Sequence, residues 1–157
     1  MIQLYKGRTF YDFWTKYQAN SNLPLIITEF GIDSYIADQT VSYGEQQQAD
    51  WEHDLWVEIR QHKDVCSGGL KFAFTDGWFG CGNLTHHDTC GSSTNAPGGQ
   101  GNGEWYGMVA FSNSDVRANY TDDIRVKATY CTFWSLWGNE TRSAAWSKEY
   151  VSSNLIE

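Results

Sequence analysis

An apolar run that ends in a single carboxylate is the feature that most constrains this chain. Residues 24–31 read Pro-Leu-Ile-Ile-Thr-Glu-Phe-Gly, so apolar and β-branched side chains lead directly to Glu29. Such a run is typical of a buried strand. A buried carboxylate is costly without a partner or a function. Glu29, at the end of the predicted strand, is therefore the first candidate functional residue.

The segments around this strand alternate between helical and extended patterns. Aromatic residues at spacings of three and four predict a helix over 9–19, and apolar residues at i, i+4 and i+8 predict a long helix from 42 or 43 to about 62. A second strand is predicted over 70–75 and a last helix over 122–136. This order implies parallel strands. Because two such strands have open edges, the pattern requires more sheet than this chain supplies.

Composition excludes several classes of partner. The chain has 157 residues, enough for one ordinary domain, and a net charge of -8. An acidic protein repels phosphate backbones, so we expect no nucleic-acid partner. No stretch approaches the roughly 18 uninterrupted apolar residues of a membrane span. Eight tryptophans and nine tyrosines suit sugar recognition, because the C–H faces of pyranose rings stack on flat aromatic rings.

Three Asn-x-Ser/Thr tripeptides predict a secreted, extracellular or cell-wall protein. Their acceptors are Asn83, Asn119 and Asn139, and they occur beside four cysteines without a Cys-x-x-Cys motif. The first residues lack the basic and then apolar pattern of a signal peptide. We therefore expect the chain to be a segment of a longer secreted protein.

Four sequence stretches together resemble a known enzyme family. They are YKGRTF at 5–10, PLIITEFGID at 24–33, SGGLKFAFTDGW at 67–78 and EWYGM at 104–108. In this order they resemble the last quarter to third of the barrel in retaining β-glycosidases of the large (β/α)8 clan. The nearest relatives are the β-glucuronidase/β-galactosidase group and the fungal cell-wall β-1,3-glucanosyltransferases. The resemblance covers roughly residues 5 to 135.

The resemblance implies an α/β fold, the C-terminal segment of a (β/α)8 TIM barrel. The chain would hold about strands seven and eight with their flanking helices, and would be incomplete alone. Residues 1–137 would form this part, with a disulfide-containing, glycine-rich loop inserted at 76–103. Residues 138–157 are a polar C-terminal tail. The upstream part of the same polypeptide, or another chain, would complete the barrel.

The resemblance also implies that Glu29 is the catalytic nucleophile at the end of strand seven. A retaining glycosidase needs an ionised carboxylate to attack the anomeric carbon and a second carboxyl group about 5–5.5 Å away to protonate the leaving oxygen. In the family this acid/base lies on strand four, upstream of this chain. Glu140, in the chain's only Asn-Glu pair, belongs to a glycosylation tripeptide and is not a candidate. Without catalysis, Glu29 would cap a helix or pair with Arg8.

Five residues are the candidate sugar contacts. Asp76 and Trp78 would lie at the mouth of strand eight, although Trp78 also suits an ordinary core position. Trp105 and Tyr106 resemble a loop platform, or they pin the glycine-rich loop. Tyr35, just beyond Glu29, could donate to a sugar hydroxyl, although its position favours surface packing.

The cysteines are interpreted as structural. Cys81 and Cys90 close a short loop and are predicted to form a disulfide, which leaves Cys66 to pair with Cys131. Three connectivities are open from sequence alone. A zinc site built from Cys81, Cys90 and the histidines between them fits no usual ligand spacing and is disfavoured. We expect no metal and no organic cofactor.

The leading prediction is a secreted retaining β-glycoside hydrolase or transglycosylase that acts on a β-linked oligo- or polysaccharide. The acid/base is missing from the segment, and three glycan acceptors accompany a loop with two cysteines. These features leave open a non-catalytic extracellular structural glycoprotein on a glycosidase-like scaffold. A carbohydrate-binding protein that uses the aromatic residues without hydrolysis is a further alternative.

Overall fold

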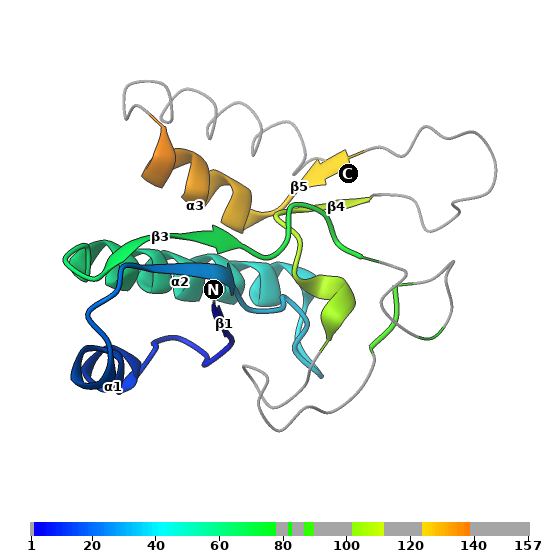
Figure 1. Cartoon of the computed structure of the whole chain (residues 1–157). Helices are drawn as coiled ribbons and strands as arrows, with labels where there is room; N and C mark the ends of the chain where they lie inside the picture. The colour runs from blue at the N-terminus through cyan, green and yellow to red at the C-terminus, as the bar shows by residue number, and fades with distance from the viewer. Residues whose placement is uncertain (1, 78–81, 83–86, 90–101, 112–123, 139–157) are drawn as a thin grey trace.

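The computed structural model of the chain describes residues 2–77, 82, 87–89, 102–111 and 124–138 (Figure 1). Helices and strands alternate through the first half of this part, and short strands precede the last helix. In chain order the elements are β1 (Ile2–Leu4), α1 (Phe13–Asn20), β2 (Leu25–Phe30), α2 (Val41–Gln61), β3 (Cys66–Lys71), the 3-10 helix η2 (Gly103–Trp105), β4 (Val109–Phe111), β5 (Ile124–Val126) and α3 (Ala128–Trp137).

The first three strands form one parallel sheet in the order β1-β2-β3. The strand that carries Glu29, β2, is central: its Ile27 aligns with Ile2 of β1 on one side and with Gly69 of β3 on the other. The parallel arrangement predicted from the order of elements is confirmed for β2 and β3. A separate antiparallel pair, β4 and β5, lies beside α3 (Figure 1).

The long helix α2 occupies the predicted span to within a residue or two. Thr40 caps it, because the threonine Oγ1 accepts a hydrogen bond of 3.2 Å from the backbone N–H of Tyr43. Near its start the helix touches the preceding loop: a Cβ added to Gly44 would lie 1.9 Å from the carbonyl oxygen of Ser34. Only glycine allows this approach, which holds the loop after β2 against the helix.

The strand predicted over 70–75 was misplaced. The strand β3 runs instead over Cys66–Lys71 and includes Gly68 and Gly69, which precede the predicted strand. A Cβ at Gly69 would lie 2.9 Å from Ile59 and 3.0 Å from Phe30, so a glycine is needed where two core side chains meet the strand. Glycine composition alone cannot distinguish such close packing from a turn.

The starts of two helices also differ from the predictions. The first helix begins at Phe13 rather than at residue 9, because Tyr11 has the left-handed φ of 52°. The last helix begins at Ala128, since residues 124–126 form β5. The strand β1 was not predicted at all, because three residues are too short for an alternation pattern.

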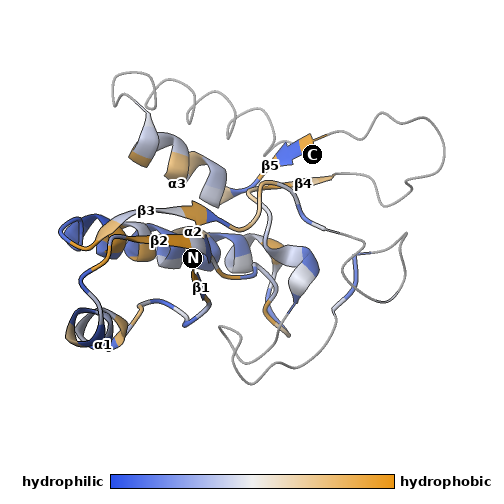
Figure 2. Cartoon of the chain, viewed as in Figure 1, coloured by the Kyte–Doolittle hydropathy of each residue, from blue (hydrophilic) through white to orange (hydrophobic). Residues whose placement is uncertain are grey.

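The core lies between the sheet and the helices. Phe30 of β2 is fully buried, with ring centroids 6.1 Å from those of both Trp56 on α2 and Phe133 on α3. Other side chains of the sheet remain open to solvent: Ile26 is 51% exposed and Leu70 is 60% exposed. Figure 2 shows the apolar character of β2 and of the end of β3. The sheet therefore combines a well-packed core with exposed apolar side chains.

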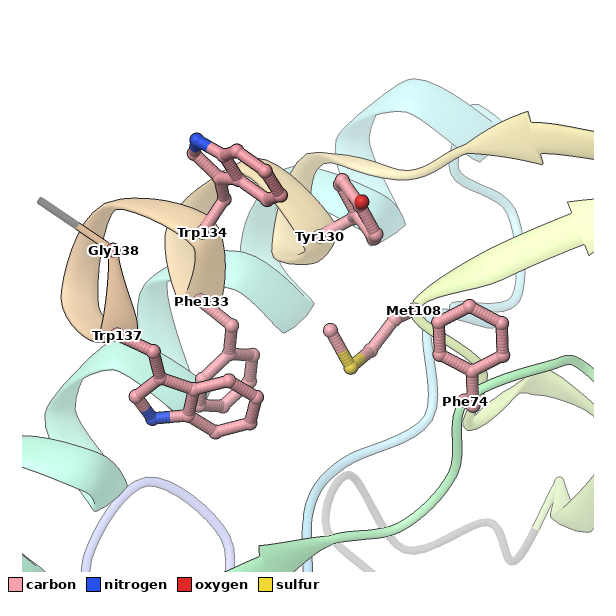
Figure 3. A pocket seen from close by; sticks show the side chains of 7 residues that line it. All are labelled: Phe74, Met108, Tyr130, Phe133, Trp134, Trp137 and Gly138. Carbon is pink, nitrogen blue, oxygen red and sulfur yellow. The ribbon is translucent and has the colours of Figure 1, made fainter. Parts of the chain in front are cut away.

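An apolar groove of about 360 Å³ lies beside α3 (Figure 3). Phe74, Trp134 and Trp137 in its lining are all exposed. The complete lining is Phe74, Met108, Tyr130, Phe133, Trp134, Trp137 and Gly138. Among the described helices, none is long and apolar enough to span a membrane.

Candidate functional site

Glu29 lies near the end of the central strand with its carboxylate partly exposed. Each carboxylate oxygen accepts a hydrogen bond of 2.7 Å, Oε1 from the Gln3 side-chain amide and Oε2 from the Tyr5 hydroxyl. Both donors come from β1 and the residue just after it. Arg8 pairs instead with Asp54 at 2.5 Å. The alternative structural role of Glu29 as the partner of Arg8 is therefore wrong.

Three aromatic side chains form a cluster beside Glu29, which we call the aromatic wall: Tyr5, Phe72 and Tyr106. Their rings meet edge to face, with centroids 5.6 Å apart for Tyr5 and Tyr106, 6.1 Å for Tyr5 and Phe72, and 5.8 Å for Phe72 and Tyr106. Phe72 is partly open to solvent, whereas Tyr106 is buried. The backbone N–H of Phe72 donates to the carbonyl of Phe30, which keeps the wall next to the end of β2.

The two phenols of the wall are held in their neutral form. Burial, followed by the hydrogen bond to Glu29, raises the pKa of Tyr5 well above its usual range. Burial also raises the pKa of Tyr106, and the negative charges of Asp33 and Glu52 add to that shift. A neutral phenol donates its proton in a hydrogen bond, and such a bond favours the ionised form of the carboxylate that accepts it. Tyr5 thus remains a hydrogen-bond donor to Glu29.

A buried ion pair anchors the wall to the core. Lys71 Nζ lies 3.0 Å from Glu52 Oε1, and both side chains are essentially inaccessible to solvent. The same ammonium donates to the carbonyl oxygens of Phe72 and Tyr106 at 2.5 and 2.6 Å. Thr129 of α3 donates to the other oxygen of Glu52. Burial raises the pKa of Glu52 and lowers that of Lys71, while their attraction opposes both shifts.

Asp76 lies inside the core rather than at an open mouth. Its carboxylate accepts from Lys127 Nζ at 2.7 and 3.0 Å and from the backbone N–H of Gly107 at 2.7 Å. Because β3 ends at Lys71, Asp76 follows an irregular segment and not a strand end. The structure therefore gives Asp76 a supporting position, in which it fixes the start of α3 against the segment that carries Tyr106.

Trp105 and Tyr35 contact each other, with ring centroids 5.3 Å apart. The other partner of Trp105 is His87, whose ring stacks on the indole at 3.6 Å and an interplanar angle of 7°. The indole N–H also donates to the carbonyl of Asp88 at 2.9 Å. These contacts match the alternative interpretation in which Trp105 pins the inserted loop. Tyr106, the next residue, belongs to the aromatic wall instead.

Several predicted residues lie outside the described part of the chain: Trp78, Cys81, Cys90, Asn83, Asn119 and Asn139. Cys66 and Cys131 are free thiols, so the predicted pairing of these two is not formed. Cys66 is buried at the start of β3, where its Sγ donates to the carbonyl of Gly68 at 3.3 Å. Within the described residues, no three His, Cys, Asp or Glu side chains gather in a way that could hold a metal ion.

The residues that hold Glu29 were missed in the sequence analysis. Gln3 and Tyr5 bond to its carboxylate, Phe72 packs on Tyr5, and Lys71 with Glu52 holds the backbone of Phe72. Tyr5 and Phe72 lie within two of the stretches that carry the family resemblance. Polar or aromatic residues where successive parallel strands end would have been the signal, because those ends meet at one edge of the sheet.

A second buried carboxylate, Asp33, follows β2. It is 4% exposed, and its Oδ2 lacks a hydrogen-bond partner by distance and angle, as does Nδ2 of the nearby buried Asn102. Burial raises the pKa of Asp33 to about 7, although Asn102, the Tyr35 backbone and the charge of Lys127 favour the anion. Asp33 is therefore expected to change charge near neutral pH.

The stability of the protein should reflect this titration. Asp33 retains a proton in the folded state up to about pH 7, whereas the unfolded chain loses it near pH 3.8. The contribution of Asp33 to stability is therefore full below its pKa in the unfolded chain, near 3.8, and is lost as pH rises through 7. Relative to Asp33→Asn, the free energy of unfolding of the unmodified protein should fall from pH 4 to 7, by at most about 1.4 kcal/mol per pH unit.

Urea unfolding at pH 4.5, 6 and 8 measures this difference. Asp38→Asn, at an exposed aspartate a few residues further on, is the matched control and should leave the pH profile unchanged. Parallel pH profiles for Asp33→Asn and the unmodified protein would contradict the assignment.

Comparisons of the chain with protein-family models, with curated proteins and with solved structures found no match.

Proposed function

We propose that the chain is part of a retaining β-glycoside hydrolase or transglycosylase that acts on β-linked glycans, with Glu29 as its nucleophile. The observation that carries the proposal is the setting of Glu29. Its partly exposed carboxylate lies near the end of the central parallel strand, each oxygen accepts a hydrogen bond from a neutral donor, and the aromatic wall borders it.

This setting suits the chemistry of a retaining enzyme. An oxygen of ionised Glu29 attacks the anomeric carbon, and the bond from that carbon to the leaving oxygen breaks. A second carboxyl group protonates the leaving oxygen and later activates the water or sugar that releases the product. Gln3 and Tyr5 hold the nucleophile in one orientation, and the exposed edge of Phe72 supplies an apolar surface for a pyranose ring. The rest of the protein would supply the acid/base.

The sheet supports the proposal that further strands complete a (β/α)8 barrel. Parallel sheets are usually covered on both faces, yet Ile26 and Leu70 are more than half exposed. In the described part of the chain, β1 and β3 each pair with one neighbour only. The apolar groove beside α3 is also open (Figure 3). Strands and helices from the upstream polypeptide, or from another chain, would cover these surfaces.

A secreted, extracellular or cell-wall location belongs to the same proposal and rests on the three glycan acceptors. The non-catalytic alternative also has an observation in its favour. In the described residues the hydrogen bonds of the Glu29 carboxylate are with Gln3 and Tyr5, and neither partner is an acid. A glycan-binding protein could use the same carboxylate to accept a bond from a sugar hydroxyl.

Covalent labelling of the full-length protein separates the two functions. An activated 2-deoxy-2-fluoro-β-glycoside should leave a glycosyl group on Glu29. Fluorine slows both the formation and the release of the glycosyl-enzyme, whereas the activated leaving group speeds its formation only, so the intermediate accumulates. Peptide mass spectrometry locates the label. Glu29→Gln should remove it, and Asp64→Asn, at an exposed carboxylate far along the chain, should not. Label on another carboxylate would overturn the assignment, and glycan binding without label or turnover would favour the non-catalytic alternative.

A further inference from the structure

A second depression with aromatic and polar walls lies on α2, apart from the aromatic wall. Its volume is about 240 Å³. Its lining residues are Tyr43, Gln46, Gln47, Asp50 and Trp51. They recur at spacings of three and four, so they share one face of the helix. The core-facing residues of this stretch, Gly44, Glu45, Gln48 and Ala49, lie on the opposite face.

The loop after β1 comes close to Trp51 at Gly7. Gly7 has the left-handed φ of 95°, and a Cβ added to it would lie 3.8 Å from Trp51 Cζ3 and 3.9 Å from the Tyr11 hydroxyl. The bare glycine backbone thus lies against both aromatic side chains. Tyr11 itself is exposed and has a left-handed φ, an uncommon conformation for a bulky residue outside a constrained turn.

The chemistry of the lining fits a neutral, polyhydroxylated ligand. Flat rings at Tyr43 and Trp51 match the C–H faces of a pyranose, and Tyr43 is 54% exposed. The Gln46 amide donates to Asp50 Oδ1 at 2.8 Å, which fixes both side chains as hydrogen-bond partners for hydroxyl groups. The lining residues include no lysine or arginine that would select a phosphate or a carboxylate.

The depression also lies toward the end of the sheet that carries Glu29. The first half of α2 begins where β2 and the loop after it end (Figure 1). The segment from Tyr5 to Tyr11 connects the two places directly, because Tyr5 donates to Glu29 and Tyr11 reaches the Gly7–Trp51 contact. A polymer bound at Glu29 would therefore have a second contact surface along the same segment of chain.

We propose that Tyr43, Gln46, Asp50 and Trp51 form an auxiliary glycan-binding site that holds a β-linked polysaccharide beyond the unit bound at Glu29. The choice of a β-linked polymer rests on the proposed function, whereas the preference for a neutral sugar rests on the lining. This site raises the affinity for long chains and leaves the chemistry at Glu29 unchanged.

The experiment compares Tyr43→Ala with Tyr43→Phe in full-length protein that also carries Glu29→Gln, so that no substrate is consumed. Calorimetry with soluble β-1,3-glucan should show binding weakened by roughly five- to tenfold for the alanine variant, because an aromatic anchor is lost. The phenylalanine variant retains the ring and should bind within about twofold of the parent. Since Tyr43 is exposed, neither change should impair folding.

Turnover supplies the second readout, with Glu29 intact. Tyr43→Ala should raise KM for the soluble glucan and leave kcat/KM for a small aryl β-glucoside unchanged, because the small substrate does not reach α2. Equal glucan affinity in the alanine and phenylalanine variants would overturn the auxiliary site, whatever role Glu29 has. Unchanged turnover in Glu29→Gln would overturn the nucleophile assignment and leave the binding comparison valid.

Discussion

Replacing Glu29 with Gln in the full-length protein is expected to lower kcat for β-linked substrates by roughly three orders of magnitude or more. The amide has nearly the shape of the carboxylate but no charge with which to attack the anomeric carbon. Substrate binding should change little, because the aromatic wall and Gln3 remain. The loss should therefore appear in kcat rather than in KM, measured with an aryl β-glycoside and a β-linked glucan.

Rescue by a small anion makes this test specific. In Glu29→Ala, azide has room to enter beside Gln3 and Tyr5 and attack the sugar in place of the carboxylate. Restored turnover with an α-glycosyl azide as product would identify Glu29 as the nucleophile. Asp64→Asn is the matched control and should retain full activity. Normal turnover in Glu29→Gln would refute the proposed role.

Replacing Lys71 with Met is expected to lower the free energy of unfolding by about 3–5 kcal/mol, because Glu52 is left buried without its counter-charge. The change also removes the donors to the carbonyls of Phe72 and Tyr106, which lie 2.5 and 2.6 Å from Lys71 Nζ. Unfolding in urea, followed by tryptophan fluorescence, measures the loss. A partial release of the aromatic wall should also reduce activity.

Two variants test whether the unpaired charge is the cause. Adding Glu52→Gln to Lys71→Met should recover part of the lost stability, since the carboxylate that has no counter-charge is then removed. Lys16→Met removes a lysine from an exposed pair with Asp12 and should change stability by less than about 1 kcal/mol. A loss for Lys71→Met as small as that for Lys16→Met would contradict the importance of the buried pair.

Much of the scaffold could be predicted because its signals are local. The spacing of apolar residues located α2, and the run before Glu29 located β2, each to within about two residues. Alternation of helix and strand predicted the parallel pairing of β2 with β3. These features follow from periodicity within one element, which does not depend on what the rest of the chain does.

The errors arose where a distant part of the chain decides the local structure. Gly69 belongs to β3 because Phe30 and Ile59 leave no room for a side chain there. Residues 124–126 are extended because β4 pairs with them, although their sequence continues smoothly into α3. Asp76 follows a predicted strand end in sequence, yet Lys127 makes it a buried ion-pair partner.

The sequence by itself determined that Glu29 stands near the end of a buried strand, because a continuous apolar run predicts such a strand without reference to any other residue. Only the tertiary structure decided what surrounds that carboxylate. Gln3, Tyr5, Phe72 and Tyr106 are up to 77 positions away from it along the chain. Gln3 and Tyr5 bond to it, and Phe72 and Tyr106 pack on Tyr5. They gather there because parallel strands align their ends at one edge of the sheet and a buried lysine ties two backbone carbonyls to that edge.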